Sequence, residues 1–137
     1  MLGSGAIIVA DETRRVLDVA FKVAKFYAHE SCGKCVPCRE GTNWTVKMLK
    51  RIESGEATPM DLDIMASVQE QIIGHCLCVL GDAMAMPIGS MVEKFREEFE
   101  EHIERRREEL DREAIGLGAE ELVAGAHSGP SELIAPA

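Results

Sequence analysis

The chain has 137 residues, the length of one domain with a short extension. Its formal net charge is −9, from 15 basic and 24 acidic residues. Because phosphate binding needs a basic face, we expect no nucleic-acid partner, and an anionic membrane surface is disfavoured for the same reason. No apolar run reaches the roughly 20 residues that a membrane-spanning helix needs, so no direct membrane insertion is expected.

Five cysteines are the unusual feature of the composition. The first residues carry no basic cluster, and the apolar run from Ala6 to Ala10 is too short for a secretory signal peptide. We therefore expect a cytoplasmic protein. In a reducing compartment, an odd number of cysteines indicates metal or redox chemistry rather than a set of structural disulfides.

The first half of the chain predicts one strand and two helices. Residues 1–10 resemble a short β-strand with no partner elsewhere in the sequence, and we interpret them as the end of a missing upstream domain. Asp11 is a candidate N-cap for a helix that runs to about Glu30. A loop rich in Gly, Pro and Cys follows over residues 31–38, and a second helix is expected over residues 39–54.

The third helix has a clear start signal. Thr58 can cap it, Pro59 suits its first turn, and Asp61 places negative charge near the positive end of the helix dipole. Gly74 is the predicted stop. A second cysteine loop is expected over residues 75–82.

A short turn from Ala83 to Met86 and a long helix over residues 88–113 complete the predicted elements. Residues 114–137 contain no Lys or Arg and are rich in small residues, which predicts a disordered tail.

Together these elements predict an all-α fold, a small four-helix bundle over residues 11–113. In an up-down bundle, the junction between the first two helices and the junction between the last two lie at the same end. The topology alone therefore brings five cysteines together: Cys32, Cys35, Cys38, Cys76 and Cys78.

The first loop has C-x2-C-x2-C spacing, at Cys32, Cys35 and Cys38. A cubane [4Fe–4S] cluster has four separate iron corners that each take one thiolate, so a tight loop can hold three corners while a distant segment supplies the fourth. A single zinc ion instead needs ligands that converge on one point. The spacing favours a [4Fe–4S] cluster, with structural zinc and a redox dithiol as alternatives.

The fourth ligand is either Cys76 or Cys78, because both lie in the second loop and spacing does not choose between them. The other cysteine is expected to be an inert, buried thiol. His75 is interpreted as an exposed loop residue rather than a ligand. No nucleophilic triad, phosphate-binding glycine motif or pair of catalytic carboxylates is evident, so we assign no catalytic residues and expect an electron-carrying domain.

Three segments give the sequence a family resemblance. They are Glu30 to Gly41 (ESCGKCVPCREG), Leu77 to Asp82 (LCVLGD), and Phe95 to Ile103 (FREEFEEHI). They resemble the C-terminal iron–sulfur domain of the flavoprotein subunit of NADH:quinone oxidoreductase, respiratory complex I. That subunit binds FMN and NADH, and it is known in mitochondria as the 51 kDa subunit. The resemblance covers about residues 2–105.

The resemblance implies that Cys78 is the fourth ligand, since the family's fourth cysteine stands one residue before a Leu-Gly-Asp segment. It further implies a [4Fe–4S] cluster that accepts single electrons from reduced FMN and passes them to the iron–sulfur chain of a neighbouring subunit. The implied partners are the other subunits of the complex, which would hold this chain at the cytoplasmic face of the membrane.

The family's FMN and NADH site lies in a long upstream region without a counterpart in this sequence. We therefore expect a truncated or split subunit that does not oxidise NADH alone. The same module resembles parts of NAD-reducing hydrogenases and NAD-dependent formate dehydrogenases, and the motifs do not separate these parents. A structural zinc-binding interaction module is the alternative from a different functional class.

Overall fold

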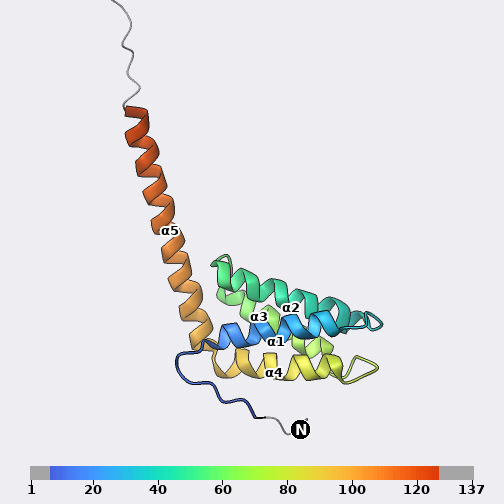
Figure 1. Cartoon of the computed structure of the whole chain (residues 1–137). Helices are drawn as coiled ribbons and strands as arrows, with labels where there is room; N and C mark the ends of the chain where they lie inside the picture. The colour runs from blue at the N-terminus through green and yellow to red at the C-terminus, as the bar shows by residue number, and fades with distance from the viewer. Residues whose placement is uncertain (1–6, 127–137) are drawn as a thin grey trace, which may run out of the picture.

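The computed structural model describes residues 7–126, and every regular element within that range is a helix. The helices are α1 (Val16–Glu30), α2 (Val36–Ser54), α3 (Pro59–Ile72), α4 (Leu80–Lys94) and α5 (Arg96–Ala126). Helices α1 to α4 form a bundle, and α5 leaves it at an angle and extends far beyond it (Figure 1). The predicted all-α bundle is confirmed, with a fifth helix added to it.

The start of α1 differs from the prediction. Asp11 does not cap the helix, because its Oδ1 accepts hydrogen bonds from the backbone N–H (3.1 Å) and the hydroxyl (2.6 Å) of Thr13 in a preceding turn. The N–H of Val16, the first residue of α1, donates instead to Glu98 Oε1 at 2.7 Å. A carboxylate from α5 thus satisfies this helix end, and no local signal could have indicated it.

Helix α2 begins inside the first cysteine loop, at Val36 rather than at residue 39. Cys35 is its N-cap residue, and Pro37 lies in the first turn, where a missing N–H leaves no hydrogen bond unmade. The helix ends at Gly55, whose φ of 83° lies in the left-handed region that favours glycine.

The predicted start of α3 is confirmed. Thr58 is the N-cap residue and Pro59 the first helical residue. The Oδ2 atom of Asp61 accepts both the backbone N–H (2.7 Å) and the hydroxyl (2.9 Å) of Thr58, while Arg51 donates to its Oδ1 at 2.9 Å. Burial opposes ionisation of Asp61, but these donors outweigh burial and lower its pKa.

This carboxylate predicts an acid-dependent contribution to stability. Because its folded pKa lies below the unfolded value, the stabilisation is complete above the unfolded pKa and is lost as pH falls through the folded pKa. Asp61→Asn is expected to lower the free energy of unfolding by about 1–2 kcal/mol at neutral pH, and by much less near pH 3. Urea unfolding at both pH values measures this. The control is Asp63→Asn, since Asp63 lies in the same helix in a largely exposed ion pair. If Asp61→Asn lowers the free energy of unfolding by the same amount at neutral pH and near pH 3, the prediction is wrong.

The segment predicted as a turn and one long helix is in fact two helices. Helix α4 starts at Leu80, so Ala83 to Met86 is helical and Pro87 lies inside the helix. The chain leaves helical geometry at Phe95 (φ −119°, ψ 28°), and α5 begins at the next residue. Pro87 was a misleading start signal, because the packing of its buried neighbours outweighs the cost of one interior proline.

Both ends of the chain also correct the prediction. Residues 7–10 are exposed and form no strand, since no strand among the described residues pairs with them. Helix α5 continues to Ala126, so residues 114–126 are helical rather than disordered. The remainder of the predicted strand and tail, residues 1–6 and 127–137, lies outside the described residues.

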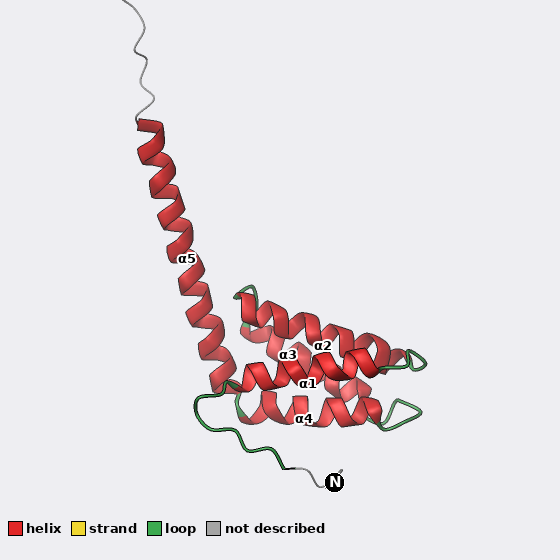
Figure 2. Ribbon diagram, viewed as in Figure 1, coloured by secondary structure: helices red, strands yellow, loops and turns green. Residues whose placement is uncertain are grey.

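The core lies between the four bundle helices and the first turns of α5. Its largest fully buried apolar side chains are Leu49, Ile52, Leu62, Met65, Ile72, Met84, Ile88, Phe99 and Ile103. None of the described helices is long and apolar enough to cross a membrane. The core holds α1 to α4 alongside one another, which fixes the two cysteine-bearing loops at one end of the bundle (Figure 2).

Candidate metal centre

The two cysteine loops meet at the end of the bundle that the topology predicts. One loop joins α1 to α2, and the other joins α3 to α4 (Figure 2). The backbone N–H of Leu77 in the second loop donates to Cys35 Sγ in the first, at 3.3 Å. This hydrogen bond joins the two loops at one cysteine sulfur.

The three cysteines of the first loop differ in exposure: Cys32 is exposed, Cys35 is intermediate and Cys38 is buried. Gly33 has a φ of 76°, in the region that favours glycine, and this conformation turns the chain between the first two cysteines. Arg39 closes the loop, because its Nη1 donates to the Gly33 carbonyl at 2.8 Å.

Several groups near the cysteines of the first loop can offset negative charge. Cys35 and Cys38 lie at the N-terminus of α2, where the helix dipole and unbonded N–H groups favour negative charge. Ser31 Oγ lies 3.3 Å from Cys38 Sγ, within hydrogen-bonding range of the sulfur. The side chain of Lys34 adds positive charge from the loop, and Arg39 adds it from the first turns of α2, where it also pairs with Glu40 at 2.8 Å. These features offset the negative charge of several thiolates at one site.

One hydrogen bond between the two ends of the second loop closes it. Gly74, with a φ of 75°, follows the end of α3, and its N–H donates to Asp82 Oδ1 in the first turn of α4 at 2.9 Å. His75 is exposed, and so is Cys78. The sequence placed both cysteines of this loop near the first loop but could not indicate the bond between Gly74 and Asp82.

Cys76 faces the bundle rather than solvent. It is half-buried and packs against the hydrophobic core, and its thiol lies 3.8 Å from the Ile72 carbonyl oxygen. Burial raises the pKa of the Cys76 thiol, and the nearby Cys38 and Cys35 raise it further. Cys76 is thus close enough to Cys38 and Cys35 for their charges to act on its thiol.

The space that Cys76 occupies depends on Gly81. A Cβ atom at position 81 would lie 2.8 Å from Cys76 Sγ and 2.9 Å from Ile72 Cγ2, which is too close. The glycine of the Leu-Gly-Asp segment therefore leaves room for this thiol, a packing role that the sequence analysis missed.

The donor set fits an iron–sulfur cluster. The five cysteines belong to one end of the bundle, and none of them forms a disulfide. Within the described part of the chain, no three His, Cys, Asp or Glu side chains converge on a position for a single metal ion. A cubane cluster is larger than one ion, so its four thiolates surround it at wider spacing, one at each iron corner.

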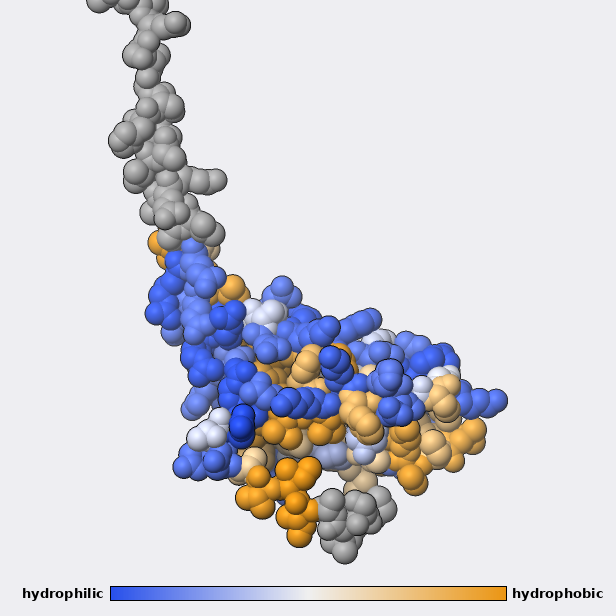
Figure 3. All heavy atoms as spheres, viewed as in Figure 1, coloured by the Kyte–Doolittle hydropathy of each residue, from blue (hydrophilic) through white to orange (hydrophobic). Residues whose placement is uncertain are grey.

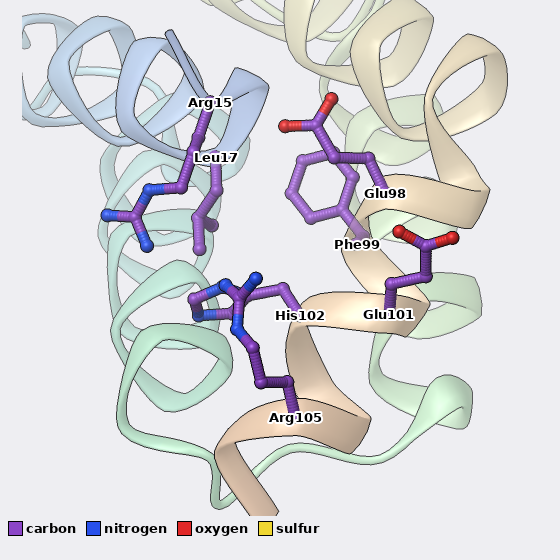
Figure 4. A pocket seen from close by; sticks show the side chains of 7 residues that line it. All are labelled: Arg15, Leu17, Glu98, Phe99, Glu101, His102 and Arg105. Carbon is purple, nitrogen blue, oxygen red and sulfur yellow. The ribbon is translucent and has the colours of Figure 1, made fainter. Parts of the chain in front are cut away.

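A small pocket at the opposite end of α1 has a different character. Figure 4 shows His102 beneath Arg15 and Leu17, with Arg105 beside its ring. The Nδ1 atom of His102 lies 2.9 Å from Arg105 Nη2. Burial lowers the pKa of His102, and the charges of Arg15 and Arg105 lower it further. We assign this histidine to the packing of α5 on the bundle.

Comparison with protein families gives a match over most of the bundle. A model of the NADH-ubiquinone oxidoreductase-F iron-sulfur binding region matches residues 18–102. This range contains all five cysteines and most of the packed core.

Three curated proteins illustrate the similarity. One of the F-type subunits of NADH-quinone oxidoreductase from Rhizobium meliloti (strain 1021) is 46% identical over 107 residues, covering 78% of this chain and 25% of that protein. The F-type subunit from Streptomyces coelicolor is 49% identical over 106 residues, covering 77% and 24%. The mitochondrial 51 kDa subunit of NADH-ubiquinone oxidoreductase from Neurospora crassa is 39% identical over 117 residues, covering 85% and 24%. The chain thus spans about a quarter of the length of these relatives.

A solved structure extends the comparison to another complex. An NAD+-reducing [NiFe]-hydrogenase, in its air-oxidized state, contains a chain that matches this one with a TM-score of 0.65 and 34% sequence identity. The match covers 69% of this chain and 17% of the hydrogenase chain.

Proposed function

Because this chain belongs to the NADH-ubiquinone oxidoreductase-F iron–sulfur binding family, whose cofactor is a [4Fe–4S] cluster, we propose that four of its five cysteines hold that cluster. The proposed ligands are Cys32, Cys35, Cys38 and Cys78. The observation that carries the proposal is the 3.3 Å contact between the Leu77 N–H and Cys35 Sγ, which joins the two cysteine loops.

When bound, the cluster supplies one-electron redox chemistry. The chain's own residues supply the ligands and their surroundings. Arg39 holds the first loop closed, the N-terminus of α2 offsets the charge of Cys35 and Cys38, and the Leu77 N–H stabilises a ligand sulfur. Hydrogen bonds and charges of this kind, together with solvent exposure, set the reduction potential of an iron–sulfur centre.

In this proposal the domain carries electrons between the flavin of an NADH-oxidising complex and a neighbouring iron–sulfur subunit. The relatives are named as subunits of NADH-quinone and NADH-ubiquinone oxidoreductases, which supports a role within a multi-subunit complex. Those partners would hold the chain at the cytoplasmic face of the membrane.

The surface near the cysteine loops supports contact with other subunits. Leu77 is 83% exposed and Val79 is 68% exposed in the second loop, while Val36 is 57% exposed at the start of α2. Figure 3 shows apolar side chains gathered at this end of the bundle. Exposed apolar side chains that gather on one surface are typical of protein–protein contacts. A contact here would place a partner beside the cluster.

A second parent complex has a specific observation in its favour. The NAD+-reducing hydrogenase chain has the same fold at 34% identity, so the domain could serve that type of complex equally well. Both functions use the same cluster and the same proposed ligands. They differ only in the neighbouring subunits, which a pull-down from the native organism followed by mass spectrometry would identify.

Anaerobic reconstitution of the chain with iron and sulfide tests the cofactor assignment. We expect about four iron and four sulfide per chain, a broad brown absorbance that bleaches on reduction, and an EPR signal from the reduced protein. A colourless protein that takes up one zinc ion instead would overturn the proposal in favour of a structural zinc module.

A further inference from the structure

The proposed function leaves one thiol without a role. Cys76 precedes Cys78 by two residues in the same loop, yet the two side chains have different surroundings. Cys78 is exposed, whereas Cys76 is half-buried and packs against the hydrophobic core. Packing therefore holds Cys76 at the end of the bundle, while the position of the exposed Cys78 depends on the loop alone.

Cys76 also lies close to the cysteines of the first loop. Leu77, the residue between the two candidates, donates its backbone N–H to Cys35 Sγ at 3.3 Å. Cys76 and Cys78 are the two sequence neighbours of Leu77. Because consecutive Cα atoms are about 3.8 Å apart, the backbones of both cysteines lie close to this contact. Cys38 and Cys35 are near enough to Cys76 to act on its thiol electrostatically.

No strong polar interaction holds the Cys76 thiol in its present position, although its side chain packs against the core. The thiol donates a hydrogen bond to the Ile72 carbonyl oxygen at 3.8 Å, and a thiol is a weak donor. On its other side the sulfur lies directly against Gly81, where an added Cβ atom would stand only 2.8 Å from it. Moving this sulfur toward the first loop therefore breaks one weak hydrogen bond and gives up part of its packing against the core.

We propose that Cys76 is a reserve ligand of the cluster, which binds the fourth iron when Cys78 does not. This proposal rests on the proposed function, since it needs a cluster held by the first loop. As the Fe–S bond forms, the thiol of Cys76 releases its proton to water. The water or hydroxide that occupied that iron leaves, and no electron is transferred.

The test compares four forms of the full chain, reconstituted anaerobically: unmodified, Cys76→Ala, Cys78→Ala and the double variant. Alanine is chosen because a serine oxygen could itself bind iron. We expect about four iron atoms per chain in the first three forms and about three or fewer in the double variant. The EPR spectrum of Cys78→Ala should differ from that of the unmodified chain, because its fourth ligand has a different environment.

Alkylation provides a readout that does not depend on the folding of the double variant. Iodoacetamide labelling followed by peptide mass spectrometry should modify Cys76 slowly in the reconstituted unmodified chain, because this thiol is half-buried, so the two proteins are compared by their rates of labelling. In reconstituted Cys78→Ala, the same residue should be protected, because its sulfur is bound to iron.

The two proposals fail in different ways. Equal iron loss in Cys78→Ala and in the double variant, or equal labelling of Cys76 in both reconstituted proteins, would overturn the reserve-ligand role and leave the proposed function standing. An unmodified chain that takes up no iron–sulfur cluster would overturn the proposed function itself.

Discussion

Replacing Cys35 with alanine is expected to reduce bound iron from about four atoms per chain to less than one. Cys35 combines three roles: it is the middle cysteine of the triplet, the N-cap residue of α2 and the acceptor of the Leu77 N–H. The first loop has no spare thiol, because the other two already serve separate corners. Iron and sulfide analysis after anaerobic reconstitution measures the loss, and the brown absorbance should disappear with it.

The matched control for this variant is Cys76→Ala, which removes a thiol from the same end of the bundle. It should keep the full iron content, since Cys78 remains available as the fourth ligand. Circular dichroism checks that both variants stay helical. Retention of about four iron atoms by Cys35→Ala would show that the first loop does not bind the cluster as proposed.

Replacing Phe99 with alanine is expected to lower the free energy of unfolding by about 3–5 kcal/mol. Phe99 is 1% exposed and belongs to α5, and it lies near Leu17 of α1 in the pocket view (Figure 4). Its loss leaves a cavity where α5 meets the bundle, and the rigid neighbours fill such a cavity only in part. Urea unfolding followed by circular dichroism measures the change.

Phe95 offers a control of the same residue type, four positions earlier in the chain. Its side chain is 46% exposed, so Phe95→Ala removes far less buried area and should cost less than about 1 kcal/mol. Similar losses in the two variants would mean that α5 is not anchored through Phe99. The iron content of reconstituted Phe99→Ala should stay near that of the unmodified chain at low temperature, because the pocket lies at the opposite end of α1 from the cysteine loops.

Several features of the fold could be predicted because their causes are local. Thr58, Pro59 and Asp61 interact within one helical turn, so their order in the sequence already specifies the start of α3. Gly55 and Gly74 mark helix ends because glycine alone takes a positive φ without strain. The spacing of the first three cysteines predicts cluster chemistry, because a short loop restricts where their sulfurs can lie.

Other features depend on residues far apart in the chain. The start of α1 is satisfied by Glu98, 82 residues away, which is why the local cap signal at Asp11 was wrong. The predicted turn from Ala83 to Met86 is helical and the break falls at Phe95, because packing of buried side chains on α4 outweighs the cost of the interior Pro87. Helix α5 also continues through residues that composition alone marked as a tail.

The cysteine site combines features that the local sequence determines with features that only the tertiary structure determines. Their number, spacing and placement in two helix junctions specify a cluster-binding bundle end, because helix order and loop length follow from local patterns. Whether Cys76 turns into the core or out to solvent is not a local property. Packing against the core, room beside Gly81 and the contact from Leu77 to Cys35 decide it, and each of these exists only once the helices have come together.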